Sequence, residues 1–196
     1  MFQKITISTL FISLLLLSCS KDDDVEIATT IQSKPNILLI IADDFGLDAS
    51  PGYNIGSIKP TMPNLENMIS NGVKFTNVWS NPTCSPTRST ILTGKYGTRT
   101  GVLKVGDELS TSETSIQTYL DNNLGQAYNH AVIGKWHLST DTNHPINMGI
   151  NYYAGLLTGG VSSYWDWNLT ENSITTNSTE YSTTKITDLA VNWVGL

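Results

Sequence analysis

The sequence is poor in charged residues, in cysteine and in long apolar stretches. Charged residues make up 14 % of the 196 residues, against roughly 25 % in average soluble proteins, whereas Ser, Thr and Asn together number 62. The formal net charge is −6 with no cluster of Lys and Arg, which excludes the basic stripe that a nucleic-acid-binding protein needs. A single long apolar stretch excludes a protein with several membrane spans. Two cysteines, Cys19 and Cys84, are too few for a disulfide framework or a cysteine-rich zinc module.

The first 18 residues have the pattern of a secretory signal. Lys4 precedes an apolar run over residues 10–17 that is interrupted only by Ser13. This run is shorter than the ~20 residues that cross a bilayer and fits the apolar region of a signal peptide. Residues 16–19 (Leu-Leu-Ser-Cys) resemble the lipobox of bacterial lipoproteins, in which the cysteine receives the lipid and becomes the mature N-terminus. An ordinary signal peptide with an incidental cysteine is the alternative.

The segment after Cys19 is polar and acidic. Residues 20–24 read Ser-Lys-Asp-Asp-Asp, a composition that favours a solvated tether over residues 19–34. The acidic start resembles the signal that sends some lipoproteins to the outer face of Gram-negative cells. We therefore expect an exported protein that is anchored to the outer membrane only by a lipid on Cys19 and faces the exterior, or else the periplasm.

The remainder, residues 35–196, predicts one α/β domain. Residues 36–42 (Asn-Ile-Leu-Leu-Ile-Ile-Ala) are typical of a parallel strand buried on both faces. Asp43 and Asp44 follow at its carboxyl end, where open α/β sheets bind ligands. Strand–helix alternation predicts a mostly parallel sheet sandwiched by helices. We expect further strands at 73–79 and 131–133, helices at 61–71, 86–92, 115–124 and 181–194, and mostly loops over 139–179.

The second cysteine lies in a sequence that favours chemistry over packing. Pro86 is placed where a helix starts, so Cys84 lies near the positive end of the helix dipole. Arg88, four residues on, can turn back toward the thiol and add a fixed positive charge. A nucleophile that faces an anionic substrate needs such surroundings. A buried structural cysteine is the alternative.

These residues resemble the sulfatases of the alkaline-phosphatase superfamily. The signature is formed by residues 84–88 (Cys-Ser-Pro-Thr-Arg) together with 92–96 (Leu-Thr-Gly-Lys-Tyr). Other segments match the family in the family's own order: 35–44 with its opening strand and metal-binding pair, 61–65, 72–77, 99–102, and 134–138 (Gly-Lys-Trp-His-Leu).

The resemblance implies a specific chemistry. In the family the cysteine is oxidised by a formylglycine-generating maturation enzyme to Cα-formylglycine. One hydroxyl of the hydrated aldehyde attacks sulfur, and the other then expels sulfate. Asp43, Asp44 and residue 84 would contact a divalent ion, Ca²⁺ or else Mg²⁺, whose chemistry suits carboxylate oxygens. Arg88 and Lys135 would hold the formylglycine and sulfate oxygens, and His137 would handle hydroxyl protons. Lys135 and His137 would share one face of an extended segment.

The substrate is less well defined. Export favours a sulfated carbohydrate, with an aryl sulfate as the other option. Ser162 or Ser163 corresponds to a hydroxyl that faces the substrate in some sulfatases. The aromatic residues over 152–167 could stack on a sugar ring or pack in a core. His144, in a loop, is expected to be structural.

The resemblance ends at residue 138. Sulfatases complete the metal site with an Asp-Asn pair, a second His and a Lys farther along, and no such pair follows residue 138. We therefore expect the N-terminal part of a larger catalytic domain, which alone binds metal weakly and turns over poorly or not at all. Two alternatives remain: a phosphodiesterase or phosphonate monoester hydrolase of the same superfamily, and an inactive surface glycan-binding lipoprotein fragment.

Overall fold

The computed structural model describes residues 34–195. The predicted signal peptide, the lipid attachment site Cys19 and all of the tether except Lys34 lie outside the described residues. The chain divides into two units, residues 1–37 and 38–196, and all elements below belong to the second. Within the described part, no helix has the length and apolar character to cross a membrane.

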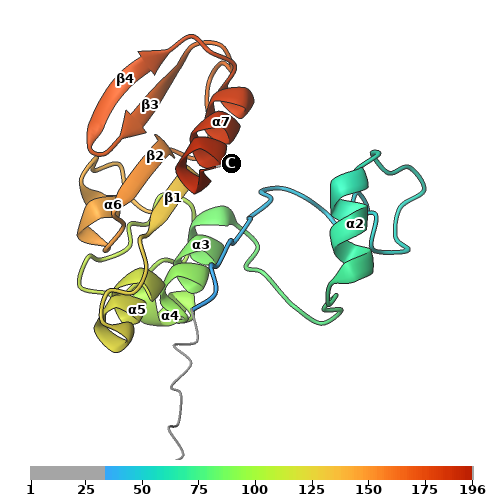
Figure 1. Cartoon of the computed structure of the whole chain (residues 1–196), viewed down its shortest axis with the longest axis horizontal. Coiled ribbons are helices and arrows are strands. Elements are labelled where there is room, and N and C mark those ends of the chain that lie inside the picture. Colours follow the sequence, from blue (N-terminus) through green and yellow to red (C-terminus); the bar gives the residue numbers. More distant parts are fainter. Residues whose placement is uncertain (1–33, 196) are drawn as a thin grey trace, which may run out of the picture. The chain divides into compact units, whose positions relative to one another are not determined.

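The second unit contains a four-stranded sheet with the order β1-β2-β3-β4 (Figure 1). Strand β1 (Ala131–Lys135) pairs in parallel with β2 (Tyr152–Leu156), whereas β3 (Trp167–Glu171) and β4 (Ile174–Ser178) continue the sheet in antiparallel fashion. The α/β class is confirmed. The described sheet is mixed rather than mostly parallel, because its last three strands form an antiparallel meander.

The expectation of mostly loops over residues 139–179 is wrong. Strands β2, β3 and β4 and the short helix α6 (His144–Asn147) all lie there. The β3–β4 turn consists of Asn172 and Ser173, both left-handed, with φ of 44° and 73°. Two left-handed residues make the turn type that matches strand twist, but its usual sequence is Asn-Gly. With Ser in place of Gly, and with many Thr and Asn in the strands, the hairpin signal is weak.

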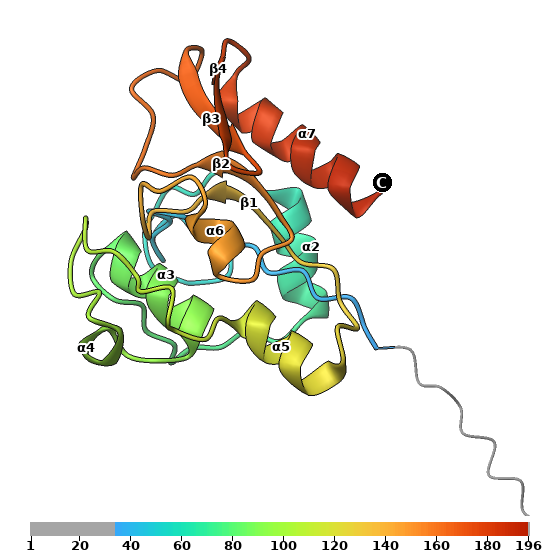
Figure 2. The ribbon, with the colours of Figure 1, turned by 90° about the vertical axis from the view of Figure 1, so that its left-hand side faces the viewer.

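The predicted helices are confirmed, with ends shifted by at most two residues. Helix α5 (Ile116–Leu124) begins after Ser115, whose side chain accepts a hydrogen bond from the Thr118 N–H, and ends at left-handed Gly125. Helix α7 packs against β1 and β2 and runs alongside the sheet (Figures 1 and 2). The remaining helical bounds are α2, Pro63–Asn71; α3, Cys84–Thr93; α4, Gly97–Thr100; and α7, Ser182–Val194.

The core is built around Trp136 and Tyr153, which meet edge to face with ring centroids 6.0 Å apart. The Trp136 indole N–H donates to His144 Nδ1 at 3.1 Å, so His144 carries its proton on Nε2 and donates it to the Leu109 carbonyl at 2.6 Å. His144 is therefore structural, as predicted. The other members of the core are Leu92, Val102, Leu109, Leu138, Met148, Ile150 and Leu157.

Two predicted strands, 36–42 and 73–79, are wrong. Neither segment is a strand, and most of their apolar side chains are exposed, Leu38 to 75 % and Trp79 to 92 %. A strand exists only through hydrogen bonds to a neighbour. Among the described residues, no strand pairs with either segment. Apolar pattern alone therefore does not produce a strand here.

Candidate active site

Cys84 is the first residue of helix α3. Thr83 before it is extended, with φ −135° and ψ 163°, and the helix ends at left-handed Gly94. The helix starts two residues earlier than Pro86 indicates, which places the half-buried thiol directly in the first turn. The partial positive charge of a helix N-terminus is concentrated in that turn.

Arg88 lies one turn farther along α3 and connects three segments. Its side chain is only 12 % exposed. One guanidinium N–H₂ group donates to the Lys135 carbonyl at the end of β1, and the other donates to Asp43 Oδ2 at 3.1 Å. The Arg88 Nε–H is buried and has no acceptor among the described residues. The guanidinium thus brings Asp43 and the end of β1 to the start of α3.

Lys135 contributes a second cation at the same carboxylate. Its Nζ lies 2.6 Å from Asp43 Oδ2. Partial burial raises the pKa of Asp43, but the hydrogen bonds and charges of Lys135 and Arg88 outweigh this effect and hold the pKa below its ordinary value of 3.8. Asp43 is therefore a carboxylate with two cationic partners.

His137 faces the thiol. Its Nδ1 lies 3.1 Å from Cys84 Sγ. The expected extended segment is wrong: β1 ends at Lys135, and His137 is left-handed with φ 56°. Its N–H donates to the Leu157 carbonyl at 3.1 Å, and the intervening Trp136 is buried in the core. Burial and the charges of Lys135 and Arg88 lower the pKa of His137, so the imidazole is neutral near pH 7.

A cavity of about 160 Å³ lies beside His137. Its volume is below the roughly 300–1,000 Å³ of drug-sized pockets. A cavity of this volume suits a fragment of the size of one sugar ring. Ser162 and Ser163, the predicted hydroxyl candidates, are not among its lining residues. That lining is Gly106, Asp107, Glu108, His137, Ser139, Thr140, Leu157, Thr158 and Gly159.

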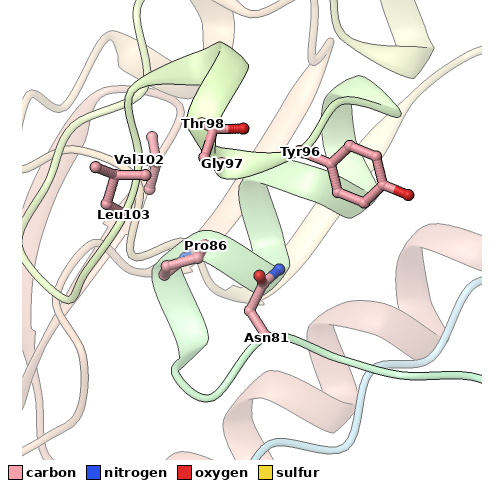
Figure 3. A pocket seen from close by; sticks show the side chains of 7 residues that line it. All are labelled: Asn81, Pro86, Tyr96, Gly97, Thr98, Val102 and Leu103. Carbon is pink, nitrogen blue, oxygen red and sulfur yellow. The ribbon is translucent and has the colours of Figure 1, made fainter.

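A second cavity, of about 210 Å³, lies between the start of α3 and α4 (Figure 3). Its lining carries no charged side chain: Asn81, Pro86, Tyr96, Gly97, Thr98, Val102 and Leu103. The Asn81 amide donates to Thr90 Oγ1 rather than to a partner in the cavity. This cavity lacks groups that could act on an ester.

Four of the five aromatic residues over 152–167 separate into two sets, whereas the half-buried Tyr152 donates to Glu171 Oε1. Tyr153 and Trp167 are buried, and Trp167 donates to the Glu180 carbonyl. Tyr164 and Trp165 are exposed, and the Trp165 ring lies 4.9 Å from that of Tyr181. Core packing thus accounts for the first set and leaves the second facing solvent.

The described residues do not fit a calcium ion. Calcium takes about six to eight oxygen ligands, and no group of three or more His, Cys, Asp or Glu side chains within residues 34–195 is placed to hold a metal. Asp43 Oδ2 contacts two cations instead. Asp44 is left-handed, with φ 54°. Its assignment with Asp43 as a metal ligand stays a prediction that this arrangement does not support.

The structure thus brings Asp43, Cys84, Arg88, Lys135 and His137 together. Comparison with known families shows what this combination belongs to: the sulfatase family model matches residues 35–196. The chain belongs to the sulfatase family. It is 35 % identical over 140 residues to human steryl-sulfatase and 38 % identical over 131 residues to mouse arylsulfatase G. Each match covers 63 % of this chain but 24 % of the relative, so the chain spans about a quarter of the length of these sulfatases.

Solved structures agree with the fold. One, described as a complex with its substrate D-glucosamine-2-N,6-O-disulfate, matches with a TM-score of 0.68 and 28 % identity over 82 % of this chain and 31 % of the other. Another, from work on glycosaminoglycan metabolism by Bacteroides thetaiotaomicron, matches with a TM-score of 0.60 and 25 % identity over 74 % of this chain and 32 % of the other. The alkaline-phosphatase-like fold of sulfatases is therefore shared by this chain.

Asp43→Asn tests the ionic contacts of the site. Because the folded chain lowers the pKa of Asp43, the stability from these contacts is present above pH 3.8 and is lost as the pH falls through the folded pKa. At pH 7 we expect the variant to be less stable by about 1 kcal/mol, the value for a partly exposed ion pair. In more acidic solution the difference should disappear. Urea unfolding of the wild type and of Asp43→Asn, at pH 7 and again well below pH 3.8, measures this difference in stability.

Asp44→Asn is the matched control, because Asp44 takes part in none of the ion pairs found in the described part of the chain. The ion-pair account is contradicted if both variants lose the same stability at pH 7. It is also contradicted if the loss of stability in Asp43→Asn persists in acid.

Proposed function

We propose that this chain carries the nucleophile side of a sulfatase active site and binds the sulfate ester of a sugar, with an aryl sulfate as the other substrate option. The observation that carries the proposal is the contact between Cys84, the first residue of helix α3, and His137 Nδ1, together with the charges of Lys135 and Arg88 that act on the same imidazole. Conversion of Cys84 to formylglycine by a maturation enzyme supplies an aldehyde whose hydrate is the nucleophile.

Arg88 and Lys135 bind and orient the sulfate. With Asp43 ionised, Asp43, Arg88 and Lys135 together carry one surplus positive charge, and all three act on His137. Both cations are mostly shielded from water, with side chains 12 % and 17 % exposed. Attraction of an anionic ester is stronger in such a site than in open solvent. The unpartnered Arg88 Nε–H adds a donor that the described protein groups leave unused.

His137 moves the proton. Its lowered pKa leaves the ring neutral near pH 7, and one ring nitrogen is directed at residue 84. A neutral imidazole at this distance can accept a proton from a hydroxyl on residue 84. The hydrogen bond to the Leu157 carbonyl fixes the backbone from which the ring projects. The described side chains fit neither calcium nor magnesium.

The substrate class and the location are part of the proposal. A structural neighbour is described with a sulfated glucosamine as its substrate, and the cavity beside His137 is of the size of one ring. The predicted lipid on Cys19 would keep the protein at the outer membrane, where polysaccharides reach it. No basic cluster supports a nucleic-acid partner.

One alternative has a specific observation in its favour. The described residues contain no assembled metal group, which also suits an inactive protein that binds glycans through a sulfatase-like surface. Such a protein would keep an unmodified thiol at residue 84. The phosphodiesterase or phosphonate hydrolase alternative differs only in the ester on which it acts.

Binding of a sulfated sugar tests the proposed site without requiring turnover. D-glucosamine-2-N,6-O-disulfate should slow the alkylation of Cys84 by iodoacetamide, and unsulfated D-glucosamine should not. Mass spectrometry monitors the alkylation. Lys135→Ala should weaken this protection by about tenfold or more, because a hydrogen bond to a charged group contributes about 1.5–3 kcal/mol. Lys95→Ala is the control, since Lys95 pairs with Glu113. The proposal is contradicted if both sugars protect Cys84 equally, or if Lys135→Ala and Lys95→Ala lose the same amount of protection.

Hydrolysis assays test the expected lack of turnover and the phosphodiesterase alternative. After coexpression with a formylglycine-generating enzyme, the 196-residue chain should hydrolyse an aryl sulfate no faster than Cys84→Ala, because its described carboxylates do not fit a divalent ion. Release above that control contradicts this expectation. Faster release from the phosphate ester of the same phenol favours the phosphodiesterase alternative.

A further inference from the structure

The loop after β2 lies against the ring of His137 at Gly159. A Cβ atom built on Gly159 stands 2.7 Å from His137 Cε1 and 2.8 Å from Nε2. Non-bonded carbon atoms pack at about 3.5–4.0 Å. The position therefore has no room for a side chain while the ring stays where it is.

The ring has little freedom to move away. The nitrogen Nδ1 faces Cys84 Sγ at 3.1 Å, so displacement of the ring changes that contact. The backbone of His137 is held in a left-handed conformation and bonded to the Leu157 carbonyl, two residues before Gly159. The preceding side chain, Trp136, is fixed in the core. The same loop thus holds the backbone of His137 and borders its ring.

We propose that Gly159 is a positioning residue: its missing side chain allows the His137 ring to lie between the loop and Cys84, with Nδ1 directed at residue 84. Gly159 acts through His137 and is assigned no contact with substrate. The proposal rests on the proposed function only where it gives His137 the proton-transfer role. The contact itself exists in the unmodified chain and can be measured there.

Gly160 provides a matched control. A Cβ at Gly160 meets no atom within 4 Å. Neither Gly159 nor Gly160 has a positive φ, so alanine is compatible with the backbone at both positions. The two alanine variants differ in the approach to the His137 ring and in the lining of the adjoining cavity, which includes Gly159 but not Gly160; the alkylation is therefore measured without any sugar present.

Alkylation of Cys84 in the full chain measures the contact. Whether Nδ1 accepts the thiol proton or donates to the thiolate, a displaced ring leaves the sulfur less reactive. Gly159→Ala should alkylate about fivefold to tenfold more slowly, as expected for the loss of one hydrogen bond, and Gly160→Ala should match the wild type. Mass spectrometry of the peptide with residue 84 keeps the signal apart from Cys19.

A double-mutant cycle tests whether the effect passes through His137. In a His137→Ala background, Gly159→Ala should cause no further change, because the ring it displaces is gone. An effect of equal size in that background overturns the proposal. So does wild-type alkylation of a folded Gly159→Ala chain, with folding checked by circular dichroism.

The wild-type chain gives an independent reading if Gly159→Ala does not fold. A nuclear Overhauser effect between the Gly159 Hα atoms and His137 Hε1 is expected, and its absence overturns the proposal. Failure of the proposed sulfatase function gives a different result. If the Gly159–His137 contact and the double-mutant cycle are as expected, but the sulfated sugar does not slow the alkylation of Cys84, then Gly159 keeps its positioning role and the proposed function is wrong.

Discussion

The site depends on one guanidinium group. Arg88 reaches from the first turns of α3 to the carbonyl at the end of β1 and to Asp43, three segments separated by more than forty residues in sequence. Arginine is suited to this role because its planar fork carries several donors in fixed directions, so that it can bond two partners at once. The group is mostly shielded from water, and its interactions are therefore weakened less by solvent and salt than those of a surface ion pair.

The contacts of Arg88 and Lys135 with Asp43 set the charge of the site. Two cations share one carboxylate, which leaves a positive surplus for an anionic ester. Burial, and then the charges of these cations, lower the pKa of the neighbouring His137 imidazole. The core determines where that imidazole lies. Trp136, fixed by His144 and Tyr153, separates Lys135 from His137, and the left-handed turn after β1 then directs the ring to Cys84. Structural residues without catalytic chemistry thus decide the geometry of the reactive ones.

Residue types and short spacings made part of this site predictable. Cys84, Arg88, Lys135 and His137 stand in motifs whose order matches the sulfatases, and the helices were marked by Ser115 and by terminal glycines. The prediction of a strand at 36–42 was wrong, because a strand requires a partner that its own sequence does not specify. Asp43 was predicted as a metal ligand and is found with two cations, since a carboxylate suits both. Gly159 carried no signal, because its contact with His137 arises only when the loop folds back.

The most direct measurement is the mass of the tryptic peptide of residues 75–88, which contains Cys84 as its only cysteine. The chain is coexpressed with a formylglycine-generating enzyme, with Cys84→Ser as a control in which a hydroxyl replaces the thiol. The account predicts that residue 84 loses its sulfur and gains an aldehyde, which reacts with a hydrazide probe. A peptide that retains an intact thiol after coexpression would contradict the assignment of Cys84 as the precursor of a sulfatase nucleophile.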